Sequence, residues 1–172
     1  MHRVERDFFM RDVLDVAPDL LGKYLVRKLD DGQIKKYIIT EVEAYRGQED
    51  LACHASKGRT SRTEIMYHNG GYIYVYLIYG MYWMLNFVTS LKDIPQAVLI
   101  RGIEGYDGPG KLTKALKIDK SFYGKDLTSN NKLWVEYGQG ISPKNIKKTP
   151  RIGIDYAGEI YKNKLWRFVL VS

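Results

Sequence analysis

The sequence has a single cysteine, Cys53, and only three histidines among its 172 residues. One cysteine excludes an internal disulfide, which is typical of proteins from a reducing compartment. Cys53, His54 and His68 are the obvious soft metal ligands, and no closely spaced pair supplies a fourth one. We therefore expect no metal site.

Long apolar runs are also missing. The first six residues, MHRVER, lack the apolar core of a signal peptide. The longest apolar run, residues 72–88, is interrupted by Gly80 and Asn86 and is a poor candidate for a membrane span. We expect an intracellular protein without membrane attachment that acts in the cytoplasm.

No repeat, low-complexity segment or shift in composition divides the chain, so residues 1–172 are expected to form a single domain. Hydrophobic residues make up 45% and charged residues 27% of the chain, as in ordinary globular proteins. The 27 basic side chains outnumber the 20 acidic ones and give a formal net charge of +7. This excess favours an anionic partner, with nucleic acid first and an acidic membrane surface second.

The hydrophobic patterns predict an α+β fold, a single compact domain with a curved, mainly antiparallel β-sheet and short peripheral helices. Short helices are expected around residues 17–22 and over 111–118, and a long functional loop with some local helix over 46–71. Residues 119–150 are polar and carry only one strand pattern. The predicted strands cover residues 24–28, 34–45, 72–77, 85–89, 97–101, 132–137, 151–154 and 165–171.

Residues 71–86, GYIYVYLIYGMYWMLN, hold five tyrosines and one tryptophan. Strand alternation directs Tyr72, Tyr74 and Tyr76 to one face and the apolar residues between them to the other. Such an aromatic face can be ordinary half-buried packing, since aromatic residues favour strands. It can also be a surface on which nucleic-acid bases stack.

A second strand, IITEVEAY, places Glu41, Glu43 and Tyr45 on one face. A carboxylate beside an aromatic ring in a partly closed site can hold a water molecule and take its proton. The two glutamates can equally pair with arginines on an exposed face, or act together as the two carboxylates of a sugar hydrolase. The charge of Glu41 would raise the pKa of Glu43 if the two lie close together.

A series of motifs extends in order over most of the chain and resembles the alkyladenine (3-methyladenine) DNA glycosylase family. The middle of the chain carries the most specific part of this resemblance. The motifs are EVEAY at 41–45, DxAxH at 50–54, GxTxR at 58–62, Met66, YVYLIYGMY at 74–82, Asn86, VLIR at 98–101, GPGKL at 108–112, RIGI at 151–154 and WRF at 166–168.

The resemblance implies an enzyme of base excision repair that cuts the bond between a damaged purine and its deoxyribose and leaves an abasic site. Glu43 would be the general base that activates water, and Arg101 would help to hold that water. The family also implies direct attack by water, without a lysine Schiff base and without a cofactor.

The resemblance further implies how the base is held. Tyr45, His54 and Tyr76 would line the pocket and sandwich the extruded base, and Asn86 would help to exclude normal bases. Tyr79, just before Gly80, would wedge into the duplex. Flipping a base out of the duplex costs a few kcal/mol, and each ring stacked on the base stabilises it by about 1 to 3 kcal/mol. Two or three aromatic rings can therefore offset the cost of flipping.

The expected partner is double-stranded DNA with damaged purines, bound by a monomer. Arg59, Arg62 and Lys111 are candidate contacts to the DNA backbone. The chain departs from the family pattern at Ser61 and at residues 69–71, Asn-Gly-Gly, which puts the substrate range in doubt more than the activity. Alkylated purines are expected substrates, and deaminated and etheno purines are further candidates. A nucleic-acid-binding module without catalysis remains the alternative.

Overall fold

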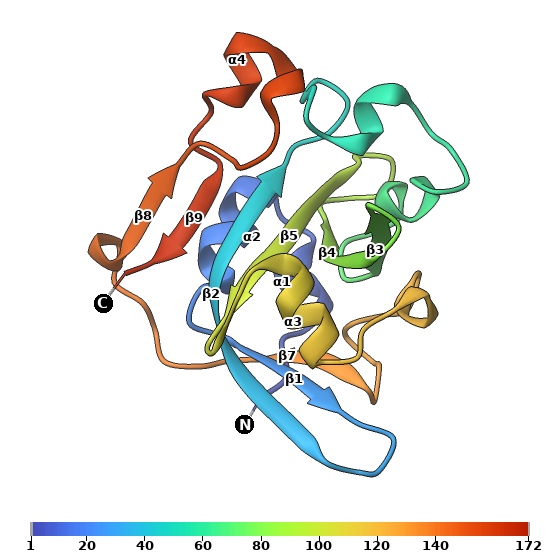
Figure 1. The fold of residues 1–172 in the computed structure, drawn as a ribbon, viewed down its shortest axis with the longest axis vertical. Helices are drawn as coiled ribbons and strands as arrows, with labels where there is room; N and C mark the ends of the chain where they lie inside the picture. The colour runs from blue at the N-terminus through green and yellow to red at the C-terminus, as the bar shows by residue number, and fades with distance from the viewer. Residues whose placement is uncertain (1, 172) are drawn as a thin grey trace.

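The computed structural model describes residues 2–171 and is built around a nine-stranded sheet (Figure 1). Every strand pairing among these residues is antiparallel, and the main order is β3-β4-β5-β2-β1-β7. The strands are β1 Tyr24–Lys28, β2 Ile34–Tyr45, β3 Ile73–Ile78, β4 Tyr82–Thr89, β5 Gln96–Ile103, β6 Tyr106–Asp107, β7 Leu133–Glu136, β8 Ile146–Thr149 and β9 Arg167–Leu170.

The long strand β2 links the parts of the sheet. Its first half pairs with β1, its second half pairs with β9, and β5 pairs with residues 39–45. The register between β2 and β5 shifts on both sides of Glu41, as in a β-bulge. Glu43 is therefore flanked by β5 at Leu99 and by β9 at Arg167, in the interior of the sheet.

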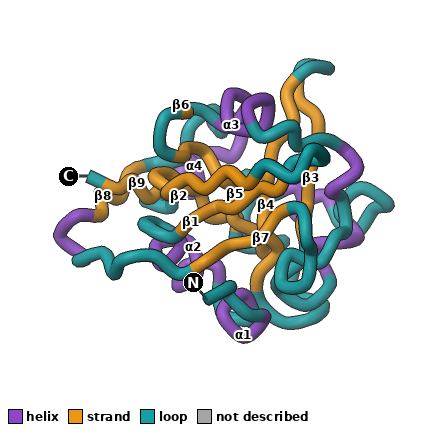
Figure 2. The backbone as a smooth tube through the Cα atoms, turned by 90° about the horizontal axis from the view of Figure 1, so that it is seen from below, coloured by secondary structure: helices purple, strands orange, loops and turns teal. Residues whose placement is uncertain are grey.

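Helices cover both faces of the sheet. Figure 2 shows α3 above it and α1 and α2 below it. The α-helices are α1 Arg6–Phe9, α2 Val13–Leu20, α3 Pro109–Ala115 and α4 Gly158–Lys162. The short 3-10 helices are η1 His54–Lys57, η2 Glu64–Tyr67, η3 Lys120–Phe122, η4 Pro143–Asn145 and η5 Asp155–Ala157.

The predicted fold class is confirmed, an open, mainly antiparallel sheet with a few short helices. The expected alternation in β3 is also present. Ile73 and Val75 lie in the main core, whereas Tyr74 is buried in a second cluster against which Tyr72 and Tyr76 pack. The aromatic face of β3 thus has its own packing partners, most of which come from the loop over residues 46–71, with Val88 of β4 and Ala97 of β5.

Two predicted elements are wrong in position. The helix expected around residues 17–22 begins earlier, at Val13, because the Asp12 side chain accepts a hydrogen bond from the Leu14 N–H and caps the helix. Residues 151–154 form no strand, because the Ile152 N–H donates to the Glu43 side chain and the Arg151 side chain donates to the Ala44 carbonyl. The neighbouring strand β8 lies at 146–149 and was not predicted.

No helix within residues 2–171 is both long and apolar enough to cross a membrane.

Candidate active site

A small cavity lies at the carboxyl end of β2, between that strand, the 46–71 loop and the aromatic face of β3. Its free volume is about 30 Å³, room for about one or two water molecules. The cavity is lined by the four residues that were predicted to recognise the base and by six others. Its lining is Tyr45, Ala52, Cys53, His54, Met66, Tyr74, Tyr76, Asn86, Ala97 and Tyr156.

Glu43, the predicted general base, is completely buried. Its Oε1 accepts a hydrogen bond from the Tyr45 hydroxyl at 2.9 Å, and its Oε2 accepts one from the Ile152 N–H at 2.7 Å. Burial raises the pKa of Glu43, and the charge of Arg101 and these two hydrogen bonds oppose the rise. The side chain is a carboxylate in fixed orientation whose affinity for a proton is increased, as a general base requires.

Glu41 lies beside Glu43 but has different partners. Its Oε2 accepts hydrogen bonds from Arg101 Nε at 2.9 Å and from Arg167 Nε at 2.8 Å. Burial opposes ionisation of Glu41, but hydrogen bonds from Arg167 and Arg101 outweigh it and hold its pKa below the usual value. Arg101 is also 3.8 Å from Glu43 Oε2. The two carboxylates therefore share one arginine. Glu41 forms ion pairs with arginines, as one interpretation of the sequence had it, but on a buried and not an exposed face.

Tyr45 forms the link between Glu43 and the cavity. Its hydroxyl is bonded to the carboxylate, and its ring lines the cavity. The Arg151 guanidinium carbon lies 5.0 Å from the centre of the ring. Burial and the charge of Glu43 raise the pKa of Tyr45 well above its usual value, so the hydroxyl stays a hydrogen-bond donor to Glu43.

Arg151 is fixed by a buried ion pair with Asp50. Arg151 Nη1 lies 2.6 Å from Asp50 Oδ2, and both side chains are almost fully excluded from solvent. The same guanidinium donates to the Ala44 carbonyl in β2. The pair holds the segment after β8 against β2, and thereby places the Ile152 N–H against Glu43.

His54 is packed between two tyrosines of β3. Its Nδ1 is 2.8 Å from the Tyr74 hydroxyl, and its ring centre is 4.4 Å from that of Tyr76. Burial, with a smaller effect from the charges of Arg62 and Lys57, lowers the pKa of His54 to about 4. The imidazole is neutral at physiological pH and adds no positive charge to the cavity.

Asn86 completes the predicted set. It is buried in β4, opposite Tyr74 of β3 and Leu99 of β5, and it lines the cavity. Its Nδ2 reaches only the Met84 carbonyl, at 3.5 Å, so the amide retains hydrogen-bonding capacity toward the cavity. Tyr45, His54, Tyr76 and Asn86 are thus brought together, with Glu43 directly behind Tyr45.

Tyr79 lies away from the cavity, at the tip of the β3–β4 hairpin, with 86% of its surface exposed. Tyr79 and Gly80 both have positive φ, 52° and 65°, and the Met81 N–H donates to the Ile78 carbonyl. This is the geometry of a type I′ hairpin turn, which is unfavourable for a tyrosine. The turn holds the ring out into solvent.

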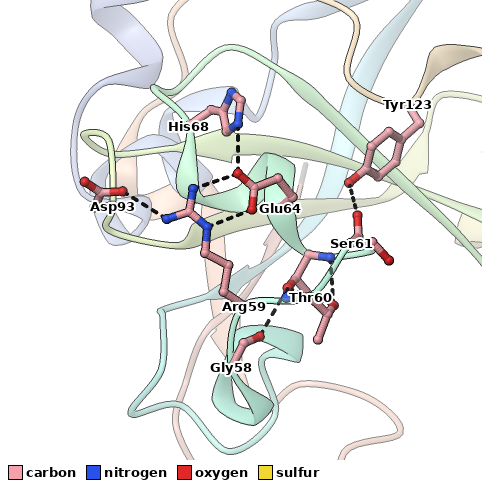
Figure 3. A network of polar contacts seen from close by, with 9 residues as sticks. Gly58, Arg59, Thr60, Ser61, Glu64, His68, Asp93 and Tyr123 are labelled. Carbon is pink, nitrogen blue, oxygen red and sulfur yellow. Dashed lines mark hydrogen bonds and ion pairs between the residues drawn. The ribbon is translucent and has the colours of Figure 1, made fainter.

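Arg59 belongs to a network of ion pairs on the 46–71 loop (Figure 3). Its guanidinium makes two 2.7 Å hydrogen bonds to Glu64 and lies 3.3 Å from Asp93. His68 Nε2 is 3.5 Å from Glu64 Oε1. Arg59 is exposed but already carries two acidic partners, with which a DNA phosphate would have to compete.

Arg62 and Lys111 are exposed and have no ion-pair partner within residues 2–171. The Arg62 guanidinium lies 5.1 Å from the ring centre of Tyr76, and Lys111 lies in the first turn of α3. Both cations are available to an anionic ligand.

Sequence reasoning missed several groups at the site. Ile152 contributes its backbone N–H, Arg167 its ion pair with Glu41, and Tyr156 its ring at the cavity. Ile152 lies in the RIGI motif and Arg167 in the WRF motif. The sequence predicted a strand at each motif but no role for either residue at the site. No pattern pointed to Tyr156.

Within residues 2–171, no group of three or more His, Cys, Asp or Glu side chains is arranged to hold a metal ion.

The chain is similar to known proteins over nearly its full length. A protein of Borreliella burgdorferi, with the name "Putative 3-methyladenine DNA glycosylase", is 47% identical over 97% of this chain and 95% of its own. Proteins of the same name from Legionella pneumophila and Natranaerobius thermophilus are 46% and 41% identical, over 99% and 98% of this chain and 95% of each relative. The family model of methylpurine-DNA glycosylase (MPG) matches residues 7–108 and 104–172. The chain therefore belongs to the methylpurine-DNA glycosylase family.

Proposed function

We propose that this protein is a DNA repair glycosylase that flips an alkylated purine out of duplex DNA and hydrolyses its N-glycosidic bond, leaving an abasic site. The observation that carries the proposal is the buried Glu43 carboxylate, tied through Tyr45 to an aromatic cavity. Burying a carboxylate is costly unless it is paired and hydrogen-bonded, and buried carboxylates with shifted pKa values cluster at functional sites. Family membership adds that relatives carry names of 3-methyladenine DNA glycosylases.

In the proposed reaction, Glu43 accepts a proton from a water molecule as the water oxygen forms a bond to C1′ of the deoxyribose. The bond between C1′ and N9 of the purine breaks, and its electron pair leaves with the base. Arg101 is close to the same carboxylate and would help to hold the water. No cofactor takes part, and no lysine lines the cavity among the described residues.

The cavity supports cationic purines as the preferred substrates. A purine methylated on a ring nitrogen is positively charged, and the departing electron pair neutralises it. Tyrosine faces attract such a cation, and His54, with its low pKa, does not repel it. A neutral purine would need a proton to leave, and Tyr74 and Cys53, with pKa values of about 12 and 11, are poor donors. We expect hypoxanthine and ethenoadenine to be released more slowly than 3-methyladenine or 7-methylguanine.

Tyr79 is proposed as the wedge that fills the space of the flipped base, and Arg62 and Lys111 as phosphate contacts. We propose a monomer as the active form, since the cavity and Glu43 are completed by one chain. Because the proposed partner is double-stranded DNA, we propose that the protein acts in the cytoplasm in association with the nucleoid, or in the nucleus if the source is eukaryotic.

Two other functions are less well supported. A sugar hydrolase would need Glu41 and Glu43 as an acid and base pair, but Glu41 is held ionised by two arginines and cannot supply a proton. A binding module without catalysis would explain the charge and the tyrosines, but it gives no reason for the buried Glu43 carboxylate.

The test is base release from a duplex with 7-methylguanine and from one with hypoxanthine, scored as free base and abasic sites. We expect release by the wild type and a loss of at least about a hundredfold in Glu43→Gln. The matched control is Glu104→Gln, which changes an exposed glutamate on the turn after β5 and should leave release unchanged.

Tight, salt-sensitive binding without release from either duplex would favour the binding module instead. A covalent protein–DNA adduct after borohydride treatment would contradict direct attack by water, since only a Schiff base is trapped in this way.

A further inference from the structure

The cavity that would receive the base is narrow in the free protein. Its volume of about 30 Å³ is far too small for a purine, although all of the predicted base-binding side chains line it. A residue of the lining must therefore move before a flipped base can enter.

Tyr156 is the lining residue that can move at the lowest cost. It is 68% exposed, whereas every other lining residue is buried or half-buried. Its hydroxyl makes a single long hydrogen bond, 3.3 Å, to the Ala52 carbonyl. Rotation of its side chain breaks this hydrogen bond and uncovers little surface, because most of the residue is already exposed.

The backbone around Tyr156 is built to hold this side chain over the cavity. Ile154 and Ala157 are buried in a small cluster with Ala52 and anchor η5 on both sides of the tyrosine. Gly153 and Gly158 flank this anchor with positive φ, 74° and 81°, and have open space beside them. The anchored residues fix the position of the Tyr156 backbone, and the exposed ring is left to move.

The same segment also contacts the catalytic carboxylate, because Ile152 donates its N–H to Glu43. Burial raises the pKa of Tyr156, the charge of Arg151 opposes the rise, and the charges of Asp50 and Glu43 add to it. Tyr156 therefore lies at the border between the base-binding cavity and the reacting bond.

We propose that Tyr156 is a further substrate-contacting residue, a movable wall that swings aside to admit the purine and then packs its ring against it. This inference rests on the proposed function and adds a residue to the recognition site. An aromatic wall supplied by a movable side chain adapts to purines of different width. It favours an alkylated, cationic purine through the electron-rich face of the ring.

The test compares Tyr156→Ala and Tyr156→Phe with Tyr137→Ala, a matched control at another exposed tyrosine, which lines a different pocket. Single-turnover base release is measured with the 7-methylguanine and hypoxanthine duplexes at saturating protein. We expect Tyr156→Ala to release 7-methylguanine about tenfold more slowly, Tyr156→Phe within about twofold of the wild type, and Tyr137→Ala at the wild-type rate.

A second readout separates contact with the base from damage to the fold. In a Glu43→Gln background, Tyr156→Ala should reduce the preference for damaged over undamaged duplex about tenfold, with affinity for undamaged duplex unchanged. Equal release and equal preference with and without the Tyr156 ring would overturn the inference alone. Absence of base release by the wild type would overturn the proposed function as well, so the two failures can be told apart.

Discussion

Arg101 donates its Nε hydrogen bond to Glu41, at 2.9 Å, and not to Glu43, whose Oε2 lies 3.8 Å away. Arg167 binds the same Glu41 oxygen from β9. Glu41 thus keeps the Arg101 guanidinium beside the Glu43 carboxylate without allowing the two to form a close ion pair. A close pair would neutralise Glu43 and make it a weaker base.

From this arrangement we predict the behaviour of Glu41→Gln. Loss of the Glu41 charge lets Arg101 interact more strongly with Glu43, which lowers the pKa of Glu43. The acid limb of the pH–rate profile should move to lower pH, and the maximal rate should fall about tenfold because the base is weaker and Arg101 is displaced. Single-turnover base release from pH 4 to 8 measures both effects. An acid limb at the wild-type position would show that Glu41 does not act on Glu43.

A pH dependence of stability is expected from His54. The folded-state pKa of about 4 lies below the usual value of 6.5, so the unfolded chain takes up this proton first as the pH falls. The contribution of neutral His54 to the free energy of unfolding is therefore fully present above pH 6.5. It falls by up to about 3 kcal/mol between about pH 6.5 and 4. In His54→Gln, which can still reach Tyr74, this loss should be missing. Urea unfolding of both proteins over that range measures it, and parallel curves would contradict the burial of a neutral imidazole.

The parts of the site that depend on local strand geometry could be predicted from the sequence. β2 has the predicted bounds, and alternation alone places Glu43 and Tyr45 on one face, where they are hydrogen-bonded. Alternation in β3 likewise separates the tyrosines from the core residues. These predictions succeed because neighbours two residues apart on a strand need no knowledge of the rest of the fold.

The contacts that come from distant segments could not be predicted. The Ile152 N–H donates to Glu43, which lies 109 residues away in the sequence. Tyr156 lies at the cavity on a turn flanked by Gly153 and Gly158, where the sequence has no periodic pattern to reveal it. The apolar alternation of residues 151–154 suggested a strand, but the buried pair of Arg151 with Asp50 fixes this segment instead. Such tertiary contacts override local preference.

The hairpin turn at Tyr79 gives a prediction that separates stability from function. At φ 52° a residue with a Cβ is strained by about 1 kcal/mol, which glycine avoids. Tyr79→Gly should therefore be about 1 kcal/mol more stable than Tyr79→Ala, equivalent to a midpoint about 2–4 °C higher in thermal unfolding. Both variants lack the wedge and should release base at similarly reduced rates. Equal stability of the two would contradict the strained turn, and wild-type release would contradict the wedge.

Arg59 and Arg62 lie on the same loop but should contribute differently to DNA binding. Arg62 has no acidic partner within residues 2–171, so contact with a phosphate costs it no ion pair. Arg59 must first give up hydrogen bonds to Glu64 and its pairing with Asp93. Affinity for undamaged duplex is measured over a range of salt concentrations.

We expect Arg62→Ala to reduce the slope of log affinity against log salt by about 1, as for the loss of one phosphate contact, and Arg59→Ala to leave it nearly unchanged. Glu64→Gln supplies the converse test, because it frees Arg59 and should increase both the affinity and the slope. If Arg59→Ala reduced the slope as much as Arg62→Ala, the ion pairs of Figure 3 would have to open when DNA binds. The loop would then rearrange on the duplex, and His68, which lies against Glu64, would be released with it.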